Sequence, residues 1–398
     1  MEAVRRLKQL FAAGKLVDPA GPGPKLPDLS RALHALAGAP GAALGPEARG
    51  LQALIGAGDH HLFVLLDGLS SAMLRRAPAG GFLATHVAAE LRTVFPATTA
   101  AALTALATGQ YPAQHAVPGW WLWLEPPGLS AEVLPFVERF GRRPLTEFGV
   151  KPEEVFTVPS AVARLAHAPL AVMPADIAES AYTRYCAGNT ATAGYKDAAE
   201  ALDRAAWRVL GAGVPTFTYV YLPHVDALAH EHGAGSGPVV KVLAELDGLL
   251  ANLAGRLAGR ARLVVTGDHG LVDIPPERTL FLDEGDPLLE HLRCPPQGES
   301  TALFLHVRPG RGEAFRKEFD ARYGGLFALL SVGEAEALRL FGPERLSPLA
   351  RARVGDFVAV GWAPGAIHYR PRSGQVTVHR GAHAGLTPEE MLVPLVLG

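Results

Sequence analysis

Two short apolar runs that lead into an aspartate constrain the fold of this chain more than any other feature. The run HLFVLL (61–66) directly precedes Asp67, and ARLVVTG (261–267) directly precedes Asp268. A third run, PTFTYVYL (215–222), lies between them in the chain. Continuous apolar runs of this length are typical of strands that are buried on both faces of a parallel sheet. We therefore expect these runs to be strands of one mostly parallel sheet.

Helical stretches alternate with these strands. Residues 29–57, 197–211 and 238–258 have helical patterns, and a helix rich in Ala and Leu ends at Gly109. The alternation predicts an α/β fold, built as a three-layer α/β/α sandwich with a mostly parallel central sheet. Residues 110–160 are rich in Pro, Trp and Gly, and we expect no regular structure in them.

A long stretch interrupts the second half of the chain. After His269, 113 residues precede the next candidate site residue, which is too many for a simple crossover. Their order of strand, helix and strand predicts a small inserted α+β subdomain, placed at residues 280–350 within a single domain of residues 1–398. Residues 356–362 and 391–397 are then expected to rejoin the central sheet as strands.

Composition and charge exclude several classes of partner. The formal net charge is −2 and no long basic run is present, so neither a nucleic-acid polymer nor an anionic membrane is expected as a partner. No window approaches 18 uninterrupted apolar residues, and the first residues lack a signal-peptide core, so we expect a cytoplasmic protein. The only cysteines, Cys186 and Cys294, form no CxxC, which argues against a disulfide framework or a thiolate metal site.

Six residues with the chemistry of metal ligands lie in four short segments. Open α/β sheets bind ligands at the carboxyl ends of their strands, so residues far apart in the sequence are expected to meet there. Carboxylate oxygens and imidazole nitrogens suit zinc, and coordination removes the cost of a buried, unpaired carboxylate. The candidate ligands are Asp67, Asp226, His230, Asp268, His269 and His383.

Each segment also has an ordinary interpretation when it is taken alone. Asp67 precedes a glycine and could form a simple turn, and the Asp-His pair after the second run could be a solvated loop. Asp226 and His230 share one face only if their segment is helical. His224 and His232 lie close by as rival ligands.

Thr98 and Thr99 stand where the helix rich in Ala and Leu begins. A threonine at this position is usually a helix cap. The same position presents backbone N–H groups and the positive end of the helix dipole, which favour a phosphate. A threonine hydroxyl becomes a nucleophile when a base or a metal activates it. The candidate metal ligands in the chain favour this second interpretation.

Taken in their order along the chain, these segments resemble the motifs of the alkaline phosphatase superfamily. They resemble most closely those of the type I phosphodiesterase/nucleotide pyrophosphatase family. VDALAHEHG, TGDHG and GAHAGLTPEEMLVPL are similar to the family's Asp-x3-His, Asp-His-Gly and C-terminal motifs. In the superfamily the nucleophile commonly lies nine residues before a Thr-Gly pair. Here that pair is Thr108–Gly109, which selects Thr99 rather than Thr98, and His383 rather than His379 matches the last ligand.

The resemblance implies a metal-dependent phosphoester hydrolase of the phosphodiesterase/nucleotide pyrophosphatase type, with a phosphothreonine intermediate on Thr99. It implies two divalent metal ions, expected to be Zn²⁺ with Mn²⁺ or Fe as alternatives, and a small-molecule phosphoester as the substrate. One ion would be held by Asp67, Asp268, His269 and the Thr99 oxygen, and the other by Asp226, His230 and His383.

One position departs from the family pattern. The family usually carries an Asn about twenty-one residues after the nucleophile, and this chain has Trp120 there, which puts nucleotide specificity in doubt. A carbon–phosphorus hydrolase of the phosphonoacetate type, a phosphomonoesterase and a non-catalytic binding relic of the fold are the alternatives. A sulfatase is disfavoured because no Cys-x-Pro-x-Arg stands at Thr99, and a phosphoglycerate mutase is disfavoured because it would use Ser.

Overall fold

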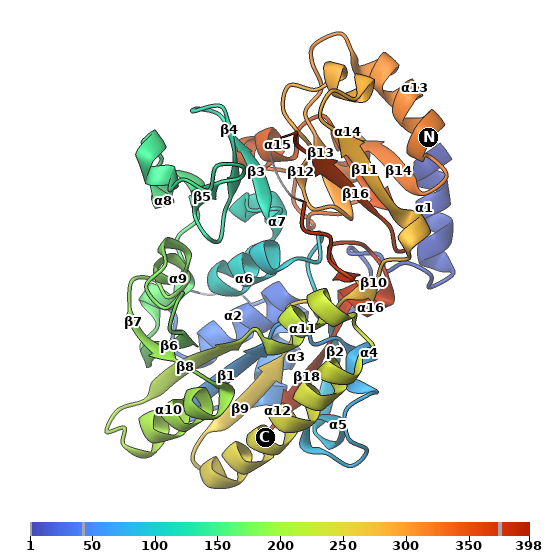
Figure 1. The fold of residues 1–398 in the computed structure, drawn as a ribbon. Coiled ribbons are helices and arrows are strands. Elements are labelled where there is room, and N and C mark those ends of the chain that lie inside the picture. The colour runs from blue at the N-terminus through green and yellow to red at the C-terminus, as the bar shows by residue number, and fades with distance from the viewer. Residues whose placement is uncertain (1, 42–43, 373–375) are drawn as a thin grey trace.

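The computed structural model describes residues 2–41, 44–372 and 376–398. Residues 42 and 43, within the stretch 29–57 that we expected to be helical, lie outside the described residues. So do residues 1 and 373–375 of the domain expected over 1–398. Figure 1 shows two sheets, with the central sheet in the lower half, the second sheet in the upper half and helix α6 (Thr99–Thr108) between them.

The central sheet has seven strands in the order β2-β18-β9-β1-β8-β6-β7. Their bounds are β1 His60–Leu66, β2 Val87–Arg92, β6 Ala168–Pro174, β7 Ala191–Tyr195, β8 Thr216–Leu222, β9 Arg262–Thr266 and β18 Leu392–Leu397. β1 pairs in parallel with both β8 and β9, and β6 pairs in parallel with β7 and β8. β18 runs antiparallel to both of its neighbours, β9 and β2. The mostly parallel sheet that the apolar runs predict is therefore confirmed.

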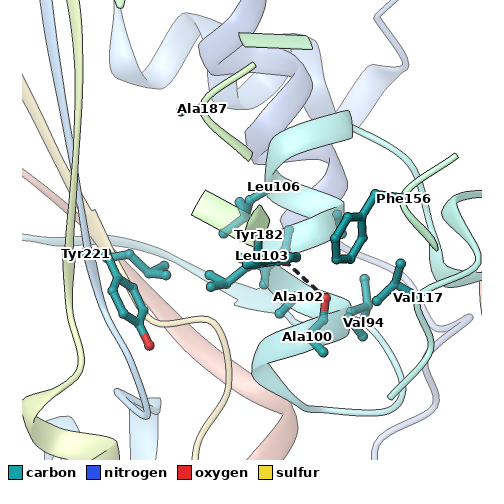
Figure 2. Packing of buried hydrophobic residues seen from close by; sticks show 14 of the residues in the cluster. Val94, Ala100, Ala102, Leu103, Leu106, Val117, Phe156, Tyr182, Ala187 and Tyr221 are labelled. Atoms are coloured by element: carbon teal, nitrogen blue, oxygen red, sulfur yellow. Dashed lines mark hydrogen bonds between the residues drawn. The ribbon is translucent and has the colours of Figure 1, made fainter. Parts of the chain in front are cut away.

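Helices from the described ranges cover the two faces of this sheet. They are α2 (Leu26–Leu36), α3 (Pro46–Ile55), α6, α10 (Ala198–Leu210), α11 (His224–His232) and α12 (Gly237–Leu257). Side chains of β1 alternate between two cores, because successive strand residues point to opposite faces. Phe63 and Leu65 pack in the core with α2, α3 and α6, part of which Figure 2 shows. Leu62, Val64 and Leu66 pack with α10, α11 and α12. The three-layer α/β/α architecture is confirmed.

The second sheet is antiparallel throughout and has the order β14-β15-β13-β12-β3-β4-β5. Its strands are β3 Trp121–Leu124, β4 Leu129–Glu132, β5 Val137–Glu138, β12 Gln297–Gly298, β13 Ala302–Leu305, β14 Phe327–Ser331 and β15 Phe357–Gly361. The expectation that 356–362 rejoins the central sheet is wrong, because β15 pairs with β13 and β14. The expectation of no regular structure in 110–160 is also wrong, since β3, β4 and β5 lie there. These strands are too short for periodicity to reveal.

Helices cover both faces of the second sheet as well. α13 (Gly312–Tyr323) packs on one face through Phe315 and Phe319, and α1 (Glu2–Ala12) packs on the other through Leu7. Some strands of this sheet lie inside the range 280–350 and others lie outside it. The boundaries of the inserted subdomain at residues 280 and 350 therefore stay a prediction. None of the helices in the described ranges has the length and apolar character that crossing a bilayer requires.

Short elements complete the fold. Two small pairs of strands join distant segments: β10 (Val272–Asp273) with β17 (Gly381–Ala382), and β11 (Thr279–Asp283) with β16 (Ala366–Arg370). The remaining α-helices of the described ranges are α4 Ser71–Leu74, α5 Phe82–Thr85, α7 Pro112–His115, α8 Pro152–Val155, α9 Ala181–Cys186, α14 Val332–Ala337, α15 Pro348–Val354 and α16 Pro388–Met391.

Candidate metal centre

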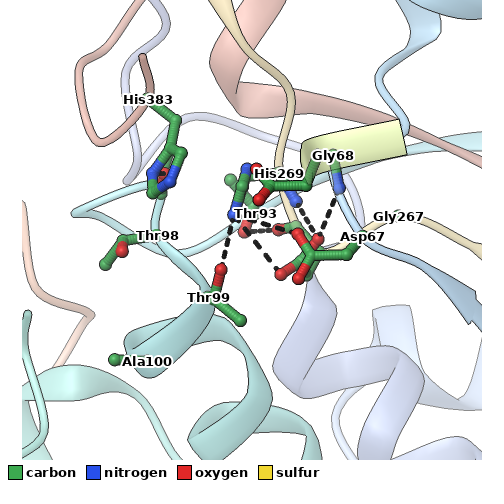
Figure 3. A network of polar contacts seen from close by, with 12 residues as sticks. Asp67, Gly68, Thr93, Thr98, Thr99, Ala100, Gly267, His269 and His383 are labelled. Carbon is green, nitrogen blue, oxygen red and sulfur yellow. Dashed lines mark hydrogen bonds and ion pairs between the residues drawn. The ribbon is translucent and has the colours of Figure 1, made fainter. Parts of the chain in front are cut away.

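Two aspartates meet at one edge of the central sheet. Asp67 directly follows β1, and Asp268 follows β9 after one glycine. Because β1 and β9 are parallel neighbours, their carboxyl ends lie at the same edge. Both side chains are buried, with 2% and 0% of their surface exposed. The Gly68 amide donates to Asp268 Oδ1 at 3.1 Å, and the Tyr221 hydroxyl donates to Asp67 Oδ2. Figure 3 shows Asp67 and Gly68 within this polar network.

Gly68 turns the chain immediately after Asp67. Its φ of +81° lies in the left-handed region that glycine tolerates best. A Cβ at this position would lie 2.9 Å from Cα of Asp226 and 2.8 Å from Cδ1 of Leu271. The glycine therefore makes the turn and also lets the start of α11 approach the end of β1.

Asp226 and His230 lie one turn apart on α11, so the helical segment on which their pairing depended is present. His230 Nε2 lies 3.3 Å from Asp226 Oδ1. His230 Nδ1 donates to the carbonyl of Gly381 at 2.8 Å. Of the rival histidines, His232 lies beside Glu231 instead, with its Nε2 3.5 Å from a carboxylate oxygen.

The strand pair β10–β17 brings the C-terminal segment to the same place. Its His383 stacks on His269, with ring centroids 4.0 Å apart. His383 Nδ1 donates to the carbonyl of Ala97 at 3.1 Å, and His269 Nδ1 donates to that of Gly270 at 3.2 Å. Like His230, each imidazole thus uses Nδ1 for a backbone carbonyl, which leaves Nε2 as the nitrogen able to coordinate a metal. Metal-binding histidines are typically fixed in this way.

Thr99 is the first residue of α6, and its Oγ lies 3.0 Å from His269 Nε2 (Figure 3). Thr98 is the N-cap residue, but its side chain makes no capping bond. Its hydroxyl donates instead to Glu299 Oε1 at 2.6 Å. In the part of the chain that the structure describes, no side chain therefore caps the first turn of α6, and its N–H groups are available to an anion.

The electrostatics of the centre favour a cation. Within the described ranges, one buried oxygen of each of Asp67, Asp226 and Asp268 has no hydrogen-bond partner. Burial, followed by the nearby carboxylates, raises the pKa of Asp67 and of Asp226 well above its usual value, and burial raises the pKa of Asp268 to about 6. Burial lowers the pKa of His269 to about 3 and that of His230 to about 4, so both are neutral and able to coordinate. Crowded buried anions are costly without a positive partner.

The donor atoms form two overlapping groups in which every atom lies within 4.8 Å of the others. They are Asp67, Asp268 and His269 in one group, and Asp226, His269 and His383 in the other. The first contains three of the four residues that the resemblance assigns to one ion. In the second, His269 replaces His230, although the His230 ring remains 5.1 Å from that of His383. The division of the residues between two ions stays a prediction.

Sequence reasoning missed Glu299 and Tyr221. Glu299 precedes β13, and its Oε1 accepts from both the Thr98 hydroxyl and the Trp120 amide, the latter at 3.1 Å. Burial raises the pKa of Glu299 to about 7. No motif surrounds this glutamate, so nothing in the sequence marks it. One feature of the sequence does indicate Tyr221. Its hydroxyl lies near the end of an apolar strand, and a buried polar atom there needs a hydrogen-bond partner.

Comparisons with known proteins agree with this architecture. The sequence model of the family described as type I phosphodiesterase / nucleotide pyrophosphatase matches residues 61–376. No curated protein matches the chain. Among solved structures, murine ectonucleotide pyrophosphatase/phosphodiesterase 5, an inactive threonine-to-alanine variant in complex with AMP, is 19% identical, with a TM-score of 0.61 over 84% of this chain and 87% of that chain.

Two further structures are similar at comparable levels. Human ectonucleotide pyrophosphatase/phosphodiesterase 5 is 15% identical, with a TM-score of 0.62 over 85% of this chain and 87% of that chain. Phosphonoacetate hydrolase from Sinorhizobium meliloti 1021, in complex with phosphonoformate, is 18% identical, with a TM-score of 0.60 over 85% of this chain and 89% of that chain. At such identities the likeness establishes the fold alone.

Proposed function

The chain belongs to the type I phosphodiesterase/nucleotide pyrophosphatase family, and from this premise we propose that it is a two-metal phosphodiesterase with Thr99 as its nucleophile. One observation carries the proposal. The Thr99 hydroxyl, on the uncapped first turn of α6, lies 3.0 Å from His269 Nε2. A phosphoryl group held there would meet a nucleophile, backbone N–H donors and candidate metal ligands together.

The donor set fits two divalent ions, for which zinc is the expected identity. Three buried carboxylate oxygens have no hydrogen-bond partner in the described part of the chain, and the imidazoles present Nε2. When bound, the ions would neutralise the carboxylates and act as Lewis acids toward the oxygens on phosphorus. Asp67, Asp268, His269 and Thr99 Oγ would hold one ion, and Asp226, His230 and His383 the other.

The reaction would proceed in two displacements at phosphorus. Thr99 Oγ loses its proton to solvent and bonds to phosphorus, while the bond from phosphorus to one ester oxygen breaks and the departing alcohol gains a proton. Water then attacks the phosphothreonine and gives up a proton, the bond from phosphorus to Thr99 Oγ breaks, Thr99 Oγ regains a proton, and a phosphate monoester leaves. The first-turn N–H groups of α6 would donate to the non-bridging oxygens.

A carbon–phosphorus hydrolase of the phosphonoacetate type is the second candidate. The likeness of fold to phosphonoacetate hydrolase supports it, and so does Arg139, which lines a cavity that also includes Thr99. A substrate carboxylate would need such a cation nearby. The guanidinium of Arg139 already stacks on Trp121 at 3.8 Å, so its orientation is fixed.

A substrate panel with matched variants tests the proposal. The metal-loaded protein should hydrolyse bis(4-nitrophenyl) phosphate faster than 4-nitrophenyl phosphate or phosphonoacetate. Thr99→Ala should fold, keep most of its metal and lose about a thousandfold or more in turnover, whereas Thr99→Ser should keep part of the activity. Thr98→Ala should lose far less than Thr99→Ala. Acid quenching followed by mass spectrometry should find phosphate on Thr99, and a fully active Thr99→Ala would overturn the assignment.

A further inference from the structure

The candidate centre opens into two cavities of different chemical character. Thr99, Trp120 and Asp226 belong to the walls of both. The first, which we name the apolar cavity, has a volume of about 300 Å³ and lies between α6 and the central sheet. The second, the polar cavity, has a volume of about 520 Å³ and includes Arg139 and Glu299 in its wall. A substrate bound at Thr99 can therefore extend in two unlike directions.

Helical periodicity explains one wall of the apolar cavity. Thr99, Leu103 and Leu106 are spaced by four and three residues, so they lie along one face of α6. Both leucines are lining residues, and Figure 2 shows them on the helix, with Tyr221 on the strand across from them. Phe217, from β8, completes the opposite wall. The nucleophile thus stands at the mouth of an apolar slot.

Most polar atoms of this wall are already engaged within the protein. The Ser30 hydroxyl donates to the Leu106 carbonyl at 2.6 Å, and the hydroxyl groups of Tyr182 and Thr104 lie 2.9 Å apart in a hydrogen bond. The hydroxyl groups of Thr183 and Thr190 are engaged too, with the Ser180 hydroxyl at 3.1 Å and the Ala187 carbonyl at 2.6 Å. A strongly polar ligand group would therefore lose its hydrogen bonds to water without replacing them.

The charged groups are confined to the mouth and to the other cavity. Among the described residues that line the apolar cavity, the carboxylates are those of Asp67 and Asp226, which lie at the candidate centre. The polar cavity instead contains the Arg139 guanidinium and the Glu299 carboxylate. This division matches a ligand with one apolar end and one polar end.

We infer that the substrate is a phosphodiester joining a hydrocarbon-rich group, held in the apolar cavity, to a polar group, held in the polar cavity. This inference rests on the proposed function and narrows its substrate class. Two unlike cavities that meet at the nucleophile would hold a diester across Thr99, with one ester group on each side. Each CH₂ group buried in the apolar cavity should favour the bound state roughly fourfold.

A homologous series of alkyl 4-nitrophenyl phosphates tests the inference with the metal-loaded full chain. Release of 4-nitrophenol should give a kcat/KM at least tenfold higher for the hexyl ester than for the methyl ester. Leu106→Trp and Ile177→Trp fill the cavity from two different elements and should each lower this ratio severalfold. Leu54→Trp changes an exposed leucine of α3 in the same way and should leave the ratio unchanged.

The outcomes separate this inference from the proposed function. Equal rates for the two esters in the unsubstituted protein would overturn the inference while the phosphodiesterase stands. A ratio that survives both cavity-filling substitutions, in variants that still unfold cooperatively, would overturn it as well. If no diester is hydrolysed, the proposed function fails, and calorimetry with hexylphosphonate and methylphosphonate still decides the inference. The unsubstituted protein should bind hexylphosphonate at least tenfold more tightly than methylphosphonate. Equal affinities would overturn the inference, and this measurement does not depend on whether any variant folds.

Discussion

The Thr99 hydroxyl lies 3.0 Å from Nε2 of His269, although the two residues are 170 positions apart in the chain. Thr99 opens α6, whereas His269 follows β9, so only the tertiary fold brings them together. His269 Nδ1 is already engaged by the Gly270 carbonyl. Its Nε2 can therefore accept the Thr99 proton or coordinate a cation, but not both at once. The state of Thr99 should depend on whether metal is present.

Removal of metal should inactivate the protein and destabilise it. Chelation would leave the carboxylates of Asp67, Asp226 and Asp268 crowded without positive charge. Metal analysis of protein purified without chelator should find about two equivalents, and chelation should lower Tm. Metal present at a thousandfold excess over its Kd would account for about 4 kcal/mol of stability. His383→Ala should lower the metal count, and full activity without bound metal would contradict the prediction.

Tyr221→Phe should weaken metal binding while leaving the fold intact. The Tyr221 hydroxyl donates to Asp67 Oδ2, and its ring packs in the core on the α6 side of the sheet. The variant keeps the ring but leaves that carboxylate oxygen without its donor, which should cost about 10- to 100-fold in metal affinity. Competition with a coloured chelator measures this.

A second tyrosine supplies the control for that measurement. The Tyr182 hydroxyl hydrogen-bonds with Thr104 and not with a candidate ligand, so Tyr182→Phe should leave metal affinity near that of the unsubstituted protein. Equal losses in the two variants would show that Tyr221 acts through packing alone.

Local patterns predicted the candidate ligands because each lies beside a recognisable element. Asp67 ends an apolar strand, and Asp226 and His230 have helical spacing. Sheet membership was harder, because β15 has the same continuous apolar pattern as β9, and long-range pairing alone distinguishes them. Glu299 could not be found at all, since only the docking of the second sheet brings it to Thr98.

Glu299→Gln should stabilise the protein at alkaline pH but not at acidic pH. Burial raises the pKa of Glu299 from 4.5 to about 7. The folded protein therefore holds this proton more tightly than the unfolded chain does. The resulting stabilisation is complete below pH 4.5 and is lost as the pH rises through about 7. Gln stays neutral and can still accept from Thr98 and Trp120. Its advantage should be on the order of 1–3 kcal/mol at pH 8.

Denaturant unfolding of the metal-loaded proteins at pH 5 and pH 8 provides the check. The free energy of unfolding of Glu299→Gln should exceed that of the unsubstituted protein by a larger amount at pH 8 than at pH 5. The same difference at both values would mean that Glu299 keeps an ordinary pKa in the folded protein.

Gly68→Ala and Gly80→Ala should differ in cost although both glycines have the same backbone conformation. Their φ angles are +81° and +80°, so each alanine should suffer a similar left-handed strain, roughly 1–2 kcal/mol. A Cβ at Gly80 meets nothing within 4 Å, whereas a Cβ at Gly68 would lie 2.9 Å from Cα of Asp226. Relief of that clash requires α11 to move away from the end of β1, which adds roughly 1–3 kcal/mol and separates Asp226 from Asp67.

Urea unfolding should therefore find Gly68→Ala the less stable variant. Metal analysis should find Gly68→Ala depleted of metal, while Gly80→Ala keeps its full metal count. If both variants lose the same stability and bind the same metal, the close approach of α11 to Gly68 is not what assembles the centre.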